Sequence, residues 1–203
     1  MNNELQVQDH DWEKMWSLNV SKRELIARFR QRSVDRDLPV FDRFVNAWIA
    51  FNAYGSIACG FENDKQTIDA LGIDNKLNGV FSDVYKNNQT FSRNVSEFQS
   101  MWPVYSESDA YRALKRRFKP NGPDDKFYPD EALMRAACKP GMVRSRPEDK
   151  SLSITWANIL NAIYQVRCNL MHGAKSPVNP RDQDLVRLSY DIITSMMDAA
   201  EMF

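Results

Sequence analysis

Apolar side chains recur along this chain at spacings of three and four residues, the period of an amphipathic α-helix. The pattern is clearest near the C-terminal end, where one helical face carries Leu152, Trp156, Ile159, Leu160, Ile163, Val166 and Leu170. Gly173 can cap this helix, and Pro177 and Pro180 prevent its continuation. A last helix is expected to begin at Arg181 or Asp182, with an inward face of Leu185, Leu188, Ile192, Ile193 and Met196.

The first half of the chain predicts two further helices. Residues 21–24, Ser-Lys-Arg-Glu, read as a capping box that opens a helix through about Val34, with Leu25, Ile26 and Phe29 inward. Pro39 suits the first turn of the next helix, which we expect to be central because it is very apolar. Gly55 and Gly60 are expected to mark its end. The apolar residues of this helix are Phe41, Phe44, Val45, Trp48, Ile49, Phe51 and Ala53.

The middle of the chain has a weaker pattern. Two helical segments are indicated between residues 63 and 100, and a short helix between Asp109 and Phe118. Five prolines between residues 119 and 150 exclude long regular helices there. We therefore predict an irregular, basic surface insertion at about 119–150, interrupted by one short helix from Asp130 to Cys138.

These patterns together predict an all-α fold. Nothing alternates with a period of two for long enough to indicate a sheet. Three or four long antiparallel helices form a helical bundle, and the length of 203 residues favours a single domain spanning residues 1–203. Trp48 and Trp156 are assigned to its core.

The composition indicates the cellular compartment of the protein more clearly than its function. The net charge is zero, but residues 110–150 contain eleven Lys and Arg against six Asp and Glu, so a local basic surface is possible. Three scattered cysteines without a CxxC argue against a disulfide scaffold. With no signal peptide and no long apolar run, we expect a cytoplasmic protein without a membrane partner.

Few residues are available for catalysis. The chain lacks GxxxxGK[ST], GxGxxG and GxSxG, has two histidines, and has no metal-ligand spacing, so neither a cofactor nor a metal is expected. His10 lies in a polar N-terminal segment that we expect to be mobile. Acid–base chemistry near neutral pH therefore falls to His172.

Arg167 precedes His172 by five positions and lies on the apolar stripe, where a charge needs a partner or a water-filled cleft. In a continuous helix the two side chains are about 140° apart. Either the helix ends between them, or a second chain completes the site. A two-fold homodimer packed through this helix end would gather two arginines and two histidines.

The pair suits the chemistry of RNA cleavage. A histidine can accept the proton of a 2′-hydroxyl or protonate the leaving 5′-oxygen. The planar fork of an arginine can stabilise the charge that develops on the phosphate. Neither step requires a metal.

Residues 163–175, Ile-Tyr-Gln-Val-Arg-Cys-Asn-Leu-Met-His-Gly-Ala-Lys, followed by Arg181-Asp182 and an apolar helix, resemble the signature of the HEPN superfamily. Residues 44–54, with Phe44, Trp48, Asn52 and Tyr54, resemble the central helix of its bacterial members. Together with the apolar helix that follows, the two segments cover about a quarter of the chain. The resemblance implies a dimerising α-helical bundle, often a metal-independent endoribonuclease of toxin–antitoxin, abortive-infection or CRISPR-linked antiviral defence.

By this resemblance, Arg167 and His172 are catalytic. The position after the arginine, usually Asn, Asp or His in catalytic members, is Cys168, and Asn169 is expected to substitute as a positioning residue. Lys175 and Asn52 are candidates for RNA or phosphate binding, although Lys175 would also suit the helix dipole and Asn52 a backbone hydrogen bond. Ala174 replaces the tyrosine of members silenced by a nucleotidyltransferase partner.

Two hypotheses follow. The first is a homodimeric HEPN-like endoribonuclease with RNA as its substrate and an antitoxin or defence-system protein as a possible partner. The alternative is a non-catalytic HEPN-like module that binds nucleotide, RNA or a protein. Cys168 favours the second hypothesis, and the intact Arg167–His172 pair favours the first. The basic run of residues 115–119 could contact RNA, but such runs are usually a solvated face.

Overall fold

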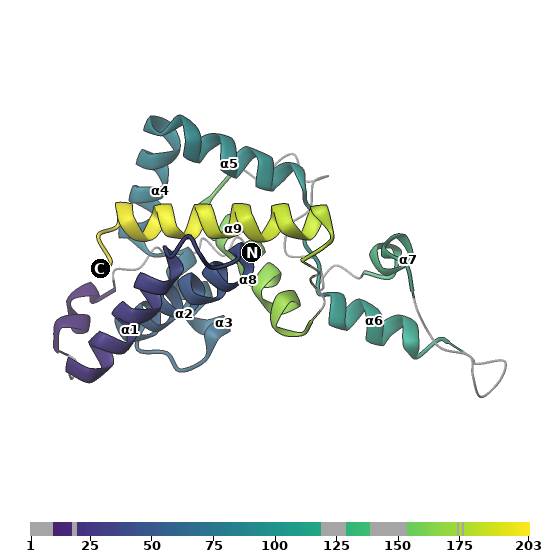
Figure 1. The fold of residues 1–203 in the computed structure, drawn as a ribbon, viewed down its shortest axis with the longest axis horizontal. Helices are drawn as coiled ribbons and strands as arrows, with labels where there is room; N and C mark the ends of the chain where they lie inside the picture. The colour runs from purple at the N-terminus through teal and green to yellow at the C-terminus, as the bar shows by residue number, and fades with distance from the viewer. Residues whose placement is uncertain (1–9, 18–19, 119–128, 139–153, 174, 176) are drawn as a thin grey trace, which may run out of the picture.

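A computed structural model describes residues 10–17, 20–118, 129–138, 154–173, 175 and 177–203 of the chain (Figure 1). The described residues form helices and contain no β-strand, which confirms the all-α prediction. Within this described part of the chain, a 3₁₀-helix, η1, is followed by nine α-helices. Their bounds are η1 Trp12–Ser17, α1 Val20–Ser33, α2 Val40–Cys59, α3 Asp64–Gly72, α4 Asn75–Asn87, α5 Gln89–Ser100, α6 Glu107–Lys115, α7 Glu131–Ala136, α8 Trp156–Met171 and α9 Pro180–Ala199.

The long helices pack into a bundle around α2, α8 and α9. Figure 1 shows α9 across the middle of the molecule, with α1 to α3 on one side and α4 and α5 on the other. Helix α2 packs against α1, α3 and α9, and α8 packs against α3. The largest fully buried side chains of the core are Trp48, Trp156, Phe44, Phe51, Phe91, Phe98, Ile68, Leu71, Leu77, Ile159, Leu160 and Ile163.

Helix α2 is the apolar centre that its sequence predicts. Pro39 stands just before its first turn, and Gly60 ends it in the left-handed region with φ +74°. Even so, no helix in the described part of the chain is long and apolar enough to cross a membrane. Gly55 was expected to mark the end of α2 together with Gly60, and this prediction was wrong for Gly55. It lies inside the helix, where α3 approaches so closely that a Cβ atom would stand 2.5 Å from Leu71 Cδ1.

One helix of the bundle was missed by the sequence pattern. Residues 63–100 form three helices, and the third, α5, buries Phe91, Val95 and Phe98. Asn88 separates it from α4 because its side chain caps α5 by accepting a hydrogen bond from the Phe91 N–H. Only three apolar residues define this face, so its periodicity is weak even though the helix packs against α9.

The N-terminal segment corrects two predictions. His10 is not in a mobile segment: its Nδ1 lies 2.8 Å from Asp74 Oδ2, and its side chain is largely buried. The other oxygen of Asp74 caps α4. In α1, Ile26 is buried and Phe29 half-buried, but Leu25 is exposed instead of inward, because α1 presents only a narrow face to α2.

The basic insertion is described only in part. Both short helices predicted around it are present, as α6 and α7, and they pack against each other and project from the bundle (Figure 1). Residues 119–128 and 139–153, which hold the remainder of the predicted insertion and Leu152, lie outside the described residues.

Gly55 and Gly79 offer a matched test of the α2–α3 packing. Both glycines are inside helices, and a Cβ at Gly79 would meet nothing within 4 Å. We expect Gly79→Ala to raise the free energy of unfolding by about 0.5–1 kcal/mol through helix propensity. Gly55→Ala should lower it by about 1–2 kcal/mol, because overpacking against Leu71 outweighs the same gain. Urea unfolding measures both, and equal stabilisation by the two substitutions would contradict the close approach.

Candidate functional site

The C-terminal end of α8 carries the residues that the sequence singled out. Thr155 caps the start of the helix by accepting a hydrogen bond from the Asn158 N–H. The helix runs through Met171, and its C-cap residue, His172, still donates its backbone N–H to the Cys168 carbonyl. Gly173 then adopts φ +69°, the left-handed conformation that ends a helix at low cost in a glycine.

The helix ends at Met171, between Arg167 and His172, as one of the two expectations allowed, but the backbone bond of His172 keeps this residue at helical spacing. Helical spacing continues to His172, so the two side chains leave α8 in directions about 140° apart. Within one chain they do not face one point. The other expectation, completion of the site by a second chain, stays a prediction.

Arg167 has the partner that its place on the apolar stripe requires. Its Nη2 lies 2.9 Å from Asp64 Oδ2, at the first residue of α3. The guanidinium also lies over the ring of Trp48, with Cζ 5.9 Å from the ring centroid, at the outer limit of a cation–π contact. The side chain remains 26% exposed, so part of this charged group is accessible to a ligand.

Asn52 belongs to the same group of residues. Its Nδ2 donates to Asp64 Oδ1 over 2.9 Å, so one carboxylate joins Asn52 of α2 to Arg167 of α8. Three polar atoms here are buried without a hydrogen-bond partner in the described structure: Trp48 Nε1, Asn52 Oδ1 and Arg167 Nε. Asn52 is therefore held beside Arg167 instead of bonding a neighbouring backbone.

Tyr164 and Cys168 line the adjacent part of α8. The ring of Tyr164 lies 5.9 Å from that of Trp48, between centroids. Burial raises the pKa of Tyr164 to about 12, and the neighbouring Cys168 thiol contributes to the same shift. Tyr164 is therefore a neutral phenol at physiological pH and can donate a hydrogen bond but not act as a base.

Asn169 has a structural environment. It is 3% exposed, and its Oδ1 accepts from Gln165 Nε2 and from the Glu107 N–H. Its Nδ2 donates to the Tyr105 carbonyl over 2.8 Å. These bonds attach the start of α6 to α8. Asn169, expected to position a substrate, has its hydrogen-bonding groups occupied by the protein.

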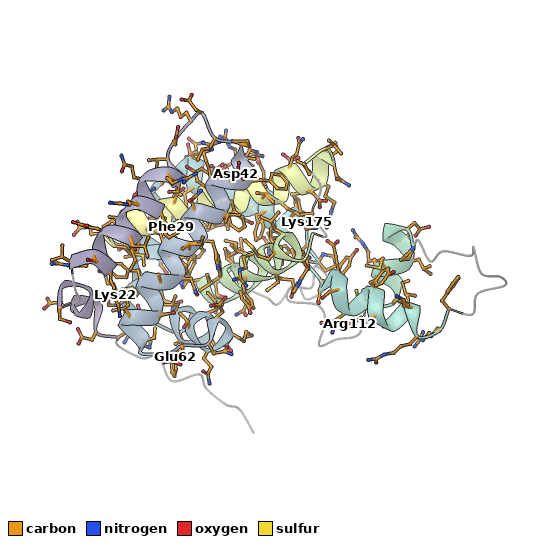
Figure 2. The ribbon with its side chains drawn as sticks, turned by 60° about the horizontal axis from the view of Figure 1, so that its bottom comes forward. Lys22, Phe29, Asp42, Glu62, Arg112 and Lys175 are labelled. Carbon is orange, nitrogen blue, oxygen red and sulfur yellow. The ribbon has the colours of Figure 1, made fainter. Side chains whose placement is uncertain are left out.

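Lys175 is also occupied. Its ammonium donates to Asp182 Oδ1 over 2.8 Å and to Glu107 Oε1, and its side chain is 3% exposed. Burial raises the pKa of Glu107, although Lys175 opposes this shift. Figure 2 places Lys175 between the bundle and the projecting helices, with Arg112 farther out on α6. A phosphate could reach Lys175 only by displacing a carboxylate.

His172, in contrast, is exposed. Among the described residues its imidazole has no hydrogen-bond partner. In the described residues no three His, Cys, Asp or Glu side chains lie close enough to hold a metal ion. The structure thus separates the five predicted site residues into three environments: Arg167 with Asn52, Asn169 with Lys175, and His172 in solvent.

Sequence reasoning missed Asp64 and the involvement of Trp48 and Tyr164. Asp64 is 103 positions from Arg167 and follows a capping asparagine, so its sequence context indicates a helix start. The usable signal was indirect: an arginine on a buried stripe demands an acidic partner, but many carboxylates of the chain could have supplied it.

No protein-family model, no curated protein and no solved structure matches the chain. Its function must be argued from its own residues.

The Lys175 network makes an asymmetric prediction. Lys175→Met removes the ammonium that joins the half-buried Glu107 to the buried Asp182, and we expect it to lower the free energy of unfolding by about 3 kcal/mol. Glu107→Gln keeps an acceptor for Lys175 and removes a charge that burial already disfavours, so it should cost about 1 kcal/mol or less. Urea unfolding at neutral pH compares the two; equal losses would show that the ion pairs do not hold α6 to the bundle.

Proposed function

We propose that this protein is a metal-independent endoribonuclease of the HEPN type that cleaves RNA by attack of a 2′-hydroxyl on the adjacent phosphate. One observation carries the proposal: α8 presents an exposed, unengaged His172 one helical turn and a half beyond a partly exposed, anchored Arg167. The proposal needs neither Asn169 nor Lys175, whose polar groups are bound within the protein.

The roles follow from the chemistry of the two side chains. His172 exchanges the proton of the 2′-hydroxyl or of the leaving 5′-oxygen. Arg167 stabilises the charge on the phosphorane-like transition state, because a guanidinium stays protonated and offers several N–H donors in one plane. Asn52 and Asp64 hold the arginine, and Trp48 supports its face.

The divergence of Arg167 and His172 at the C-terminal end of α8 leads us to propose that the active unit is a homodimer. Two copies related by a two-fold axis through the α8 ends would place Arg167 of one chain near His172 of the other. A setting in toxin–antitoxin or antiviral defence, with an antitoxin or defence protein as partner, is what the HEPN resemblance implies for this proposal.

A non-catalytic RNA- or nucleotide-binding module is the second candidate. Cys168 favours it, because this position beside Arg167 carries a thiol where the catalytic members of the resembled superfamily usually carry Asn, Asp or His. The same experiments separate the two functions, since such a module would bind RNA and leave it intact.

The first test is cleavage of a labelled single-stranded RNA in the presence of EDTA. We expect products with 2′,3′-cyclic phosphate and 5′-hydroxyl ends. His172→Ala should lower the rate by about 10²–10⁴-fold, the usual share of a positioned acid or base. Its melting temperature should match that of the unaltered protein, because the His172 side chain is exposed. Products with 5′-phosphates, a strict magnesium requirement, or full activity of His172→Ala would refute the mechanism.

The second test asks whether one site draws residues from two chains. Arg167→Gln and His172→Ala should each be nearly inactive, and Gln replaces the arginine with an uncharged polar side chain. Mixing the two variants should restore activity, because one site of a mixed dimer then pairs an intact Arg167 with an intact His172 of the other chain. Light scattering should show a dimer. A monomer, or a mixture as inactive as its components, would contradict the shared site.

A further inference from the structure

Asp64 is the contact point between three elements of the bundle. It is the first residue of α3, where the Asn63 side chain fixes the backbone by accepting from the Lys65 and Gln66 N–H groups. Its two carboxylate oxygens contact different helices: Oδ1 accepts a hydrogen bond from Asn52 Nδ2, and Oδ2 forms an ion pair with Arg167 Nη2, each over 2.9 Å. The carboxylate is thereby oriented from both sides.

The contact leaves most of the Arg167 guanidinium available. Asp64 binds a single terminal nitrogen and not a two-nitrogen edge. Nη1 neither bonds a described residue nor belongs to their buried unpaired atoms, so it reaches solvent. A phosphate can therefore bind the outer Nη1–Nη2 edge while Asp64 keeps its ion pair with Nη2, because each terminal nitrogen carries two hydrogens.

The surrounding atoms make the orientation dependent on Asp64. Arg167 Nε and Asn52 Oδ1 are buried without hydrogen-bond partners among the described residues, so the contacts to Asp64 are what hold these two side chains here. Trp48 limits the guanidinium on one face. Without the Asp64 carboxylate, Arg167 would lose its single ionic anchor among the described residues and could turn toward solvent to satisfy Nε.

We propose that Asp64 is the positioning residue for Arg167: it holds the guanidinium against Trp48 with the outer edge presented to the phosphate of an RNA substrate. This role rests on the proposed endoribonuclease function. Asp64 itself touches no reacting atom. Fixing a catalytic group in advance lowers the cost of reaching the transition state, and a misplacement of about 1 Å can cost about 10²-fold in rate.

The kinetic test compares Asp64→Ala with Asp69→Ala. Asp69 lies on the same helix, is exposed and pairs with Lys65, so the control removes the same charge and a comparable surface ion pair. We expect Asp64→Ala to lower kcat by about 10–100-fold with a smaller change in KM. Asp64→Asn, which keeps an oxygen acceptor for Arg167, should recover part of the loss, and Asp69→Ala should match the unaltered protein.

A second readout does not depend on cleavage. The Nε–H signal of Arg167 in a nitrogen-15 NMR spectrum, assigned by its loss in Arg167→Lys, should exchange slowly with solvent because Nε is buried. Asp64→Ala should speed this exchange, and Asp69→Ala should not. Fluorescence anisotropy can measure the affinity for a single-stranded RNA in the His172→Ala background. Asp64→Ala should lower this affinity, and Asp69→Ala should not.

The outcomes separate this proposal from the proposed function. Faster cleavage by Asp64→Ala would mean that Asp64 competes with phosphate, and the positioning role would be wrong. Cleavage, exchange and RNA affinity equal to those of Asp69→Ala would also overturn it. If the unaltered protein does not cleave RNA, the endoribonuclease fails, and the exchange rate together with RNA affinity decides whether Asp64 positions Arg167 for a phosphate ligand.

Discussion

Burial of α8 is the constraint on which the rest of this structure depends. The helix contacts the core on more than one side, and beside its apolar residues it also buries the amides of Gln165 and Asn169. A polar group in such a position destabilises the fold unless another element supplies its partner. The elements around the end of α8 therefore meet two demands at once: they complete the apolar core, and they bring hydrogen-bond acceptors and charges to fixed points.

Two pairs of neighbouring helices meet these demands differently. On one side, α2 and α3 bring Asn52 and Asp64 to Arg167 and leave the guanidinium partly exposed. On the other, the start of α6 and the start of α9 bring Glu107 and Asp182 to Lys175 and bury the ammonium. The ion pair of Arg167 thus leaves its cation accessible to a ligand, whereas the ion pairs of Lys175 are structural. The difference lies in the solvent exposure of the two cations.

Local pattern accounts for most of the helices. Three- and four-residue spacing is set within a few turns of chain, so it predicted α2, α8 and α9 together with the burial of Trp48 and Trp156. It failed where the deciding contact was distant. Gly55 resembles a helix end in sequence, but it is the place where α3 approaches α2. His10 resembles part of a mobile terminus until Asp74, at the start of α4, binds it.

The same distinction between local pattern and distant contact applies to the candidate site. From the sequence alone it could be determined that Arg167 lies on a buried stripe and needs a partner, that Gly173 ends the helix, and that His172 is the histidine at that end. The tertiary structure decided that the partner is Asp64, that Asn52 shares it, and that Asn169 and Lys175 are used to hold α6. The physical reason is range: helical periodicity depends on neighbours three and four residues away, whereas an ion pair depends on which surfaces meet once distant helices have packed.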